Sequence, residues 1–174
     1  MKNMNLKINQ QGILEFSGKS VTDLAEKYGT PLYVMDEMMI RNRLNTFNKA
    51  MKEAFDEKAE VLYASKACDF LAMYRLIQEE NCGVDVVSDG EIFTAFKAGF
   101  PMGKAYFHGN NKSQSEIEFA LSLDIGTIVV DNYQELLLID KIVKQLGKKV
   151  KVLFINIVNP LETRTAFNRP CQRT

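Results

Sequence analysis

Apolar and polar residues follow a regular rhythm through most of the chain. Short apolar stretches that suit β-strands begin near Glu60, Val84, Ala105, Thr127 and Val150, so successive stretches start 24, 21, 22 and 23 residues apart. Each interval also holds a run in which apolar residues recur every three or four positions, the period of an amphipathic helix. These helical runs cover residues 70–80, 90–98, 113–123 and 133–146. Repeated strand–helix units of this length predict a parallel sheet joined by right-handed crossovers.

The predicted helices carry end signals. Residues 113–116 (Ser-Gln-Ser-Glu) match a capping box, in which serine and glutamate satisfy free backbone N–H groups at a helix start. We expect glycines to close the helices on their C-terminal sides, because glycine adopts the left-handed backbone conformation without strain. These glycines are Gly83, Gly99, Gly126 and Gly147.

The first part of the chain follows a different pattern. Residues 6–16 alternate loosely around Gly12, which predicts a small hairpin. Residues 20–23 (Ser-Val-Thr-Asp) resemble a capping box and predict a short helix that ends near Gly29. Residues 31–36 read as a strand, and the apolar positions that follow, as far as Phe55, recur at helical spacing.

Composition excludes several classes of partner. The chain has 22 basic and 22 acidic residues and no net charge, so no basic face for nucleic acid is predicted. The first residues lack the apolar segment of a signal peptide, and no apolar run approaches the length of a membrane span. Cys68, Cys82 and Cys171 show no metal-ligand spacing and read as reduced thiols. We therefore expect a cytoplasmic protein with no metal, membrane or nucleic-acid partner.

The fold class predicted by the rhythm is α/β. A doubly wound sheet and a (β/α)₈ barrel of the TIM type both fit parallel strands that alternate with helices. The chain has 174 residues, enough for one well-packed domain. A complete barrel typically needs about 250 residues, so a barrel made by this chain would be incomplete.

Lys66 is the first candidate for chemistry. It lies in residues 63–67 (Tyr-Ala-Ser-Lys-Ala), directly after an apolar strand candidate. Parallel α/β folds place their reactive groups at the carboxyl ends of strands. A lysine amine there can form a Schiff base with a carbonyl, including that of pyridoxal phosphate. The alternative is an ordinary solvated lysine.

Asp85 and His108 are further candidates, and Glu91 is a weaker one. Asp85 lies in the next strand, where a carboxylate can hold the charge state of a nearby lysine. His108 is the single histidine and ends the following strand. Because no second metal ligand accompanies it, it would face a cofactor rather than bind metal. In the simpler interpretation Asp85 starts a strand and His108 is structural. Glu91 then lies in the first turn of a helix, where the helix dipole stabilises an acidic side chain.

Five segments together resemble diaminopimelate decarboxylase, a fold-type III, alanine-racemase-like pyridoxal phosphate enzyme. They are residues 28–34 (Tyr-Gly-Thr-Pro-Leu-Tyr-Val), 63–67, 83–91 (Gly-Val-Asp-Val-Val-Ser-Asp-Gly-Glu), 98–101 (Ala-Gly-Phe-Pro) and 107–113 (Phe-His-Gly-Asn-Asn-Lys-Ser). Each segment alone is weak evidence, but this order and spacing are specific. The resemblance runs from about residue 14 to about residue 151.

The resemblance implies a barrel fold, pyridoxal 5'-phosphate as cofactor, and decarboxylation of meso-2,6-diaminopimelate to L-lysine. It implies that Lys66 is the Schiff-base lysine and that Asp85 and His108 lie beside the cofactor. A homodimer is expected for the full-length enzyme. Two residues depart from the family's usual pattern, since Cys68 stands where asparagine is common and Asp89 where glycine is common.

The resemblance also implies a domain organisation. Residues 1–30 would pack on a C-terminal β-domain that this chain lacks, and residues 31–156 would form a partial barrel. Residues 157–174 have neither strand nor helix periodicity, and a shifted reading frame near residues 152–160 would explain this tail. The chain alone is therefore expected to be inactive. The open alternatives are an ornithine- or arginine-type decarboxylase, a non-catalytic truncated product, and a small pyridoxal phosphate carrier, which the N-terminal hairpin disfavours.

Overall fold

The computed structural model describes residues 5–155. Their contacts divide the chain into two compact units, residues 1–47 and 48–174, which are described separately below. The predicted tail at residues 157–174 lies outside the described residues. The predicted domain boundaries at residues 30 and 156 stay predictions. No helix in the described part of the chain is both long and apolar enough to cross a membrane.

The first unit begins with a small antiparallel sheet, as predicted. Strands β1 (Leu6–Ile8), β2 (Leu14–Phe16) and β3 (Lys19–Ser20) are joined in that order. The Asn9 side chain accepts hydrogen bonds from the backbone of Gln11 and Ile13, both 3.0 Å, which fixes the hairpin turn. Helix α1 (Val21–Tyr28) follows, with the Ser20 hydroxyl capping its start as the capping signal predicts.

The predicted strand at residues 31–36 is wrong. The segment has no regular secondary structure in this structure, because no neighbouring strand within the described residues pairs with it. Pro31 also lacks the N–H group that a ladder needs. The segment ends at Asp36, whose Oδ1 accepts a hydrogen bond of 3.0 Å from the Met39 backbone at the start of helix α2 (Glu37–Phe55). Hydrogen bonds from Ser17 and from the Met39 backbone lower the pKa of the Asp36 carboxyl.

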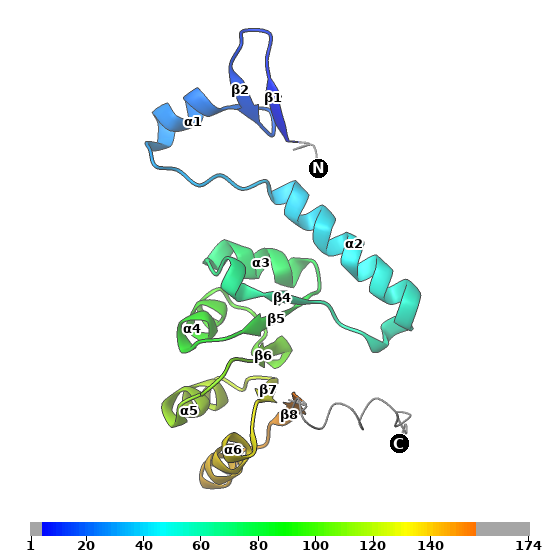
Figure 1. Cartoon of the computed structure of the whole chain (residues 1–174), viewed down its shortest axis with the longest axis vertical. Helices are drawn as coiled ribbons and strands as arrows, with labels where there is room; N and C mark the ends of the chain where they lie inside the picture. The colour runs from blue at the N-terminus through cyan, green and yellow to red at the C-terminus, as the bar shows by residue number, and fades with distance from the viewer. Residues whose placement is uncertain (1–4, 156–174) are drawn as a thin grey trace, which may run out of the picture. The chain divides into compact units, whose positions relative to one another are not determined.

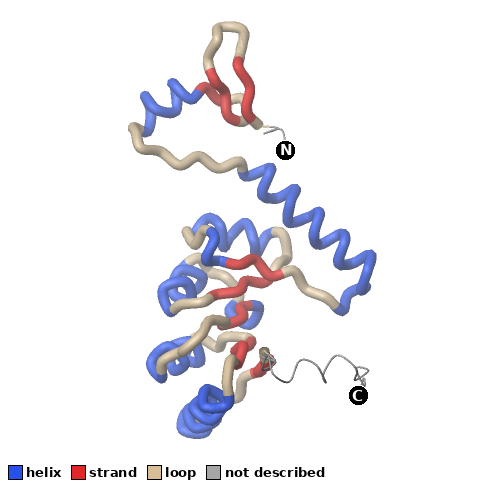
Figure 2. Tube along the Cα trace, in the orientation of Figure 1, coloured by secondary structure: helices blue, strands red, loops and turns tan. Residues whose placement is uncertain are grey.

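The second unit is a five-stranded parallel sheet in chain order, which confirms the predicted α/β class. Its strands are β4 (Leu62–Ala64), β5 (Gly83–Val86), β6 (Ala105–Phe107), β7 (Thr127–Val130) and β8 (Lys151–Phe154). The connecting helices are α3 (Leu71–Glu79), α4 (Asp89–Lys97), α5 (Gln114–Ser122) and α6 (Tyr133–Leu146), as Figures 1 and 2 show. Short 3₁₀ turns are η1 (Asp56–Lys58), η2 (Ser65–Ala67) and η3 (Met102–Lys104).

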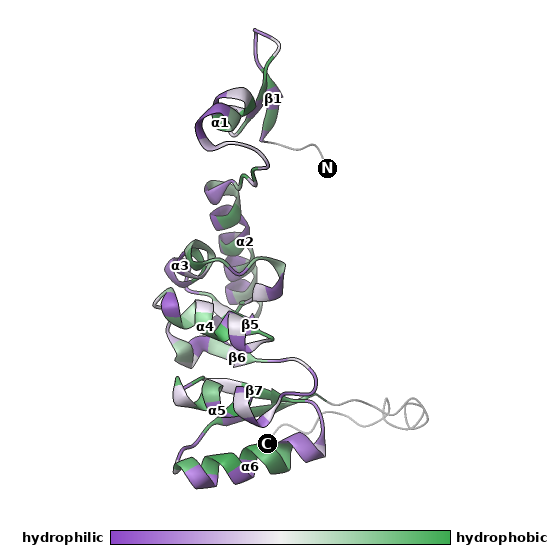
Figure 3. Ribbon diagram, turned by 90° about the vertical axis from the view of Figure 1, so that its left-hand side faces the viewer, coloured by the Kyte–Doolittle hydropathy of each residue, from purple (hydrophilic) through white to green (hydrophobic). Residues whose placement is uncertain are grey.

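The core of this unit lies between the sheet and helices α3–α6, which run along one face of the sheet (Figure 1). Alternate strand residues face these helices and are fully buried, among them Val84, Phe107 and Ile128. Each helix is amphipathic, and in Figure 3 helix α6 shows distinct apolar and polar stretches. A doubly wound sheet carries helices on both faces, so helices on one face favour the barrel arrangement.

Only two of the four predicted closing glycines have that role. Gly99 and Gly147 adopt positive φ angles (79° and 63°) just after α4 and α6. After α3 and α5 the left-handed residues are Asn81 and Asp124, both at φ 56°. Both side chains are short and polar, a type that tolerates this conformation.

Gly83 and Gly126 are required for space instead. A Cβ atom on Gly126 would lie 2.0 Å from the Gly103 carbonyl oxygen, and one on Gly83 would lie 2.5 Å from Leu62 Cδ2. Both glycines stand where a strand begins, so they allow close packing at the amino edge of the sheet.

Candidate functional site at the carboxyl edge of the sheet

Lys66 lies on the turn η2, directly after β4, as its sequence position predicts. Ala64 pairs with Asp85 in the register of β4 and β5, so Lys66 leaves the sheet just beyond the level of Asp85. The preceding Ser65 is fully buried, whereas Lys66 itself is exposed. Within residues 5–155 no hydrogen bond or ion pair engages the Lys66 ammonium. The turn is therefore anchored while the amine stays accessible.

The Ser65 hydroxyl provides part of that anchor. It lies 2.8 Å from the Asp85 carbonyl oxygen and within hydrogen-bond distance of Glu91 Oε2. Tyr63 adds a second anchor, because its phenol donates a hydrogen bond of 3.1 Å to the Cys68 carbonyl on the far side of the turn. The short segment between β4 and α3 is thus tied down on both sides of Lys66.

Asp85 and His108 come together on the face of the sheet that α3–α6 do not cover. His108 directly follows β6, and its backbone N–H donates a hydrogen bond of 2.8 Å to the Val86 carbonyl. The imidazole Nδ1 lies 3.5 Å from Asp85 Oδ1, and both side chains are partly exposed. A protonated imidazole would form an ion pair with the carboxylate at this distance. Among residues 5–155, neither Asp85 nor His108 forms a hydrogen bond or ion pair with Lys66.

Glu91 occupies the first turn of α4, as predicted, but its carboxylate points inward and is buried. Its Oε2 accepts a hydrogen bond of 3.0 Å from the Val87 backbone and contacts the Ser65 hydroxyl. Tyr74 donates a 3.2 Å hydrogen bond to the Glu91 carbonyl, and burial raises the pKa of the Tyr74 phenol to about 12. Glu91 thus links the ends of β4 and β5.

A buried ion pair between Lys112 and Glu135 was not foreseen from the sequence. The Lys112 ammonium lies 2.8 Å from Glu135 Oε1, and the two side chains are only 2% and 5% exposed. The ammonium also donates to the carbonyls of Gly109 and Val129, both at 2.7 Å. All three of its hydrogens are therefore used.

The spacing around Glu135 in the sequence does not reveal this pair. Glu91 and Glu135 each stand three residues after a helix-capping residue, Ser88 and Asn132. The same spacing also occurs at Ser113 and Glu116, where the glutamate turns back to its own cap. The spacing therefore indicates a helix start and does not tell a buried carboxylate from an exposed one.

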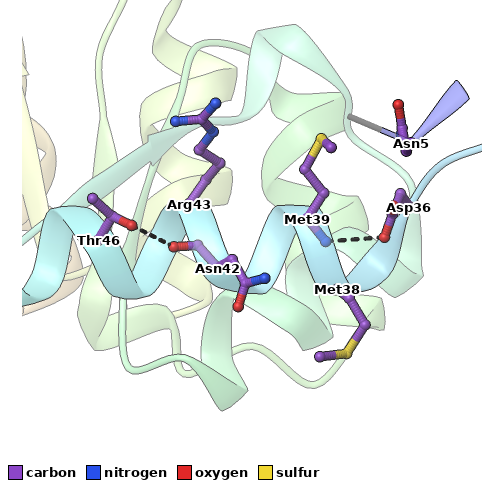
Figure 4. A pocket seen from close by; sticks show the side chains of 7 residues that line it. All are labelled: Asn5, Asp36, Met38, Met39, Asn42, Arg43 and Thr46. Carbon is purple, nitrogen blue, oxygen red and sulfur yellow. Dashed lines mark hydrogen bonds between the residues drawn. The ribbon is translucent and has the colours of Figure 1, made fainter. Parts of the chain in front are cut away.

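A surface hollow lies in the first unit, and hydrogen bonds within helix α2 or at its start already use two of its polar side chains. It has a volume of about 350 Å³ and is lined by Asn5, Asp36, Met38, Met39, Asn42, Arg43 and Thr46 (Figure 4). Its carboxylate, Asp36, is engaged as the cap of α2, and Thr46 donates its hydroxyl hydrogen to the Asn42 carbonyl at 2.7 Å. The candidate residues Lys66, Asp85 and His108 lie instead at the carboxyl edge of the parallel sheet.

Comparison with known proteins shows the family to which this segment of the chain belongs. A family profile described as "Pyridoxal-dependent decarboxylase, pyridoxal binding domain" matches residues 38–165, a span that includes Lys66, Asp85 and His108. The chain belongs to the pyridoxal-dependent decarboxylase family. Within it, the diaminopimelate decarboxylase of Bacillus methanolicus is 49% identical over 162 residues, which are 91% of this chain and 36% of that protein. The Bacillus subtilis enzyme is 48% identical over 157 residues, 90% of this chain and 35% of that protein.

Solved structures of pyridoxal-dependent decarboxylases give the same result. The diaminopimelate decarboxylase of Methanocaldococcus jannaschii aligns with a TM-score of 0.81 and 39% identity over 91% of this chain and 37% of that chain. A lysine/ornithine decarboxylase of Vibrio vulnificus aligns less closely, with a TM-score of 0.62 and 25% identity over 77% of this chain and 34% of that chain. The predicted resemblance to diaminopimelate decarboxylase is confirmed. This chain spans about a third of the length of the relatives that it matches.

Proposed function

We propose that this chain forms the pyridoxal phosphate-binding part of a diaminopimelate decarboxylase, which converts meso-2,6-diaminopimelate to L-lysine and carbon dioxide. The observation that carries the proposal is the exposed Lys66 amine on an anchored turn at the carboxyl edge of the sheet. That turn lies inside the segment that matches the pyridoxal binding domain.

The residues at this edge fit the cofactor. Its aldehyde requires a free primary amine, and Lys66 supplies one, whereas the Lys112 ammonium is buried and fully bonded. When bound, pyridoxal phosphate supplies an electron-withdrawing ring that stabilises the negative charge left on the substrate carbon by departing carbon dioxide. Lys66 would hold the cofactor through Nζ. Asp85 and His108, whose Oδ1 and Nδ1 atoms lie 3.5 Å apart on the open face, would orient it.

The named relatives support meso-2,6-diaminopimelate as the substrate. Matches at 38–49% identity are diaminopimelate decarboxylases, and one solved relative from Methanocaldococcus jannaschii, 38% identical, is a co-complex with L-lysine. An ornithine-type decarboxylase is the alternative, and the Vibrio vulnificus lysine/ornithine enzyme matches less closely. The eight-stranded barrel, the homodimer and the cytoplasmic location belong to the same proposal, and helix cover on a single sheet face supports the barrel.

Reductive labelling tests the role of Lys66. The protein is incubated with pyridoxal phosphate and reduced with borohydride, and the modified peptide is mapped by mass spectrometry. We expect the label on Lys66 and its loss in Lys66→Ala. Lys49→Ala, which removes another exposed lysine outside the site, should label normally. A label on other lysines with Lys66 unmodified would contradict the assignment.

A chimera tests the substrate. The matched segment of the Bacillus methanolicus enzyme is replaced by this chain, and carbon dioxide release is measured from meso-diaminopimelate, ornithine and arginine, with the unfused chain assayed beside it. We expect fastest release from meso-diaminopimelate by the chimera, and loss of that release in its Lys66→Ala version. Faster turnover of ornithine or arginine would favour the alternative. The parallel assay shows separately whether the chain alone is active.

A further inference from the structure

The Lys112 side chain ties the loop after β6 to the next strand and helix. This loop, residues 108–112, starts with His108 and contains two left-handed residues, Gly109 (φ 99°) and Asn111 (φ 57°). Lys112 reaches back across the loop, and its Nζ donates a hydrogen bond of 2.7 Å to the Gly109 carbonyl. The lysine thereby closes a turn that begins with the histidine of the candidate site.

The other partners of Lys112 belong to the next strand–helix unit. They are the Val129 carbonyl of β7 at 2.7 Å and Glu135 Oε1 of α6 at 2.8 Å. Glu135 is itself fixed, since its Oε2 accepts a 2.7 Å hydrogen bond from the Asp131 backbone and its own N–H is capped by Asn132 at 2.9 Å. The loop that carries His108 is therefore fastened to a rigid point on β7 and α6.

The opposite side of the loop is also constrained. A Cβ atom on Gly109 would lie 3.2 Å from the Val87 carbonyl oxygen, so the loop packs closely on the segment that follows β5. Asp85 lies two residues before Val87. Lys112 on one side and this close packing on the other leave the His108 imidazole within 3.5 Å of Asp85.

A stabilising role alone does not explain the pair well. Replacing a buried ion pair by apolar residues of similar volume is often neutral or stabilising, so its presence calls for another reason. The three hydrogen bonds of Lys112 also leave it no capacity to act as a nucleophile or a proton donor to a ligand.

We propose that Lys112, fixed by Glu135, is a positioning residue that holds the 108–112 loop so that the His108 imidazole stays beside Asp85. Its importance for catalysis rests on the proposed function, because that function places His108 and Asp85 at the cofactor. The geometric part of the proposal does not depend on any bound group.

His108 is the single histidine of the chain, so its imidazole NMR signals can be assigned without ambiguity. In the otherwise unchanged protein, Asp85→Asn should shift these signals. In Lys112→Met we expect the His108 signals to move toward those of an exposed histidine. When Asp85→Asn is added to Lys112→Met, it should shift these signals much less than it does in the unchanged protein. The comparison forms a double-mutant cycle that measures how strongly Lys112 controls the contact.

Lys148→Met is a control for loss of a lysine with the same kinds of hydrogen-bond partner at a more exposed site. Lys148 also joins a backbone carbonyl, that of Leu121 at 2.6 Å, to a carboxylate, Asp124 Oδ1 at 2.7 Å, but at the opposite end of β7. We expect this variant to leave the His108 signals and their response to Asp85→Asn unchanged. Because Lys112→Met leaves a buried carboxylate unpaired, Lys112→Met/Glu135→Gln serves as a second variant that removes both charges and keeps an acceptor for Asp131.

Cofactor binding gives an independent readout. In the double variant the apparent affinity for pyridoxal phosphate, measured by labelling of Lys66, should fall about tenfold, by analogy with the loss of a residue that orients a metal ligand. A folded double variant with native His108 signals and a full response to Asp85→Asn would overturn the proposal. So would unfolding of both Lys112 variants beside a folded Lys148→Met, since Lys112 would then serve stability. If the unchanged protein never labels Lys66, the proposed function fails while the NMR cycle still decides the positioning role.

Discussion

Burial separates the roles of the two lysines at the carboxyl edge of the sheet. Lys66 is exposed and can offer its amine to a carbonyl, whereas Lys112 is buried and donates to three oxygens. The sequence locates Lys66 because the residue following a short apolar strand has a predictable place in a parallel sheet. It does not reveal the role of Lys112, whose carboxylate partner is 23 residues away in the next strand–helix unit. Pairs of this kind depend on how two neighbouring strand–helix repeats pack against each other. The local pattern of apolar and polar residues does not encode that packing.

Tyr74 gives a prediction at the residue scale. Burial raises the pKa of its phenol from the ordinary 10.0 to about 12. Between pH 10 and pH 12 the folded protein keeps a proton that the unfolded chain has released, so the free energy of unfolding falls as pH rises through this window. Tyr74→Phe removes that titration, and we expect its melting temperature to fall less steeply over the same range. Tyr133→Phe, at an exposed site, is the control, and parallel curves for Tyr74→Phe and the unchanged protein would count against the idea.

Elements were predicted well where a helix or strand repeats a strong apolar period. The five parallel strands and four connecting helices of the second unit lie where the rhythm places them, and α2 ends at Phe55 as predicted. The error at residues 31–36 has a different origin. Strand propensity alone does not create a strand, because a partner must supply the hydrogen bonds. The glycine signals failed at Gly83 and Gly126, since glycine near a helix end can serve either a left-handed turn or close packing.

Gly126 gives a prediction at the element scale. Its Cβ would fall 2.0 Å from the Gly103 carbonyl oxygen, and a backbone atom cannot move aside as a flexible side chain can. We expect Gly126→Ala to lower the free energy of unfolding by about 1–3 kcal/mol, the usual cost of overpacking. Gly103→Ala is the matched control, because a Cβ there meets no atom within 4 Å. Urea denaturation measures both, and equal stabilities for the two variants would disprove the packing explanation.

At the scale of the whole molecule, the two units differ in the amount of core that they contain. In the second unit, side chains from three central strands and four helices are fully buried, including Val84, Phe107, Ile128 and Ile142. In the first unit the backbone hydrogen bonds are as regular, but α1 has no buried residue and Leu44 of α2 is its single buried apolar side chain among those described. Both units therefore have regular hydrogen bonding, but only the second combines it with a large buried apolar area.

This separation leads to a prediction about local stability. Local opening is governed by the apolar surface that must be exposed, so segments with little core open at low free energy even when they are hydrogen-bonded. We expect amide hydrogens of β1, β2 and α1 to exchange with solvent deuterium much faster than those of β5, β6 and β7. Hydrogen exchange of the whole chain, followed by mass spectrometry of peptides from each unit, measures the difference. Equal protection in both units would mean that hydrogen bonding, rather than buried apolar area, sets local stability in this protein.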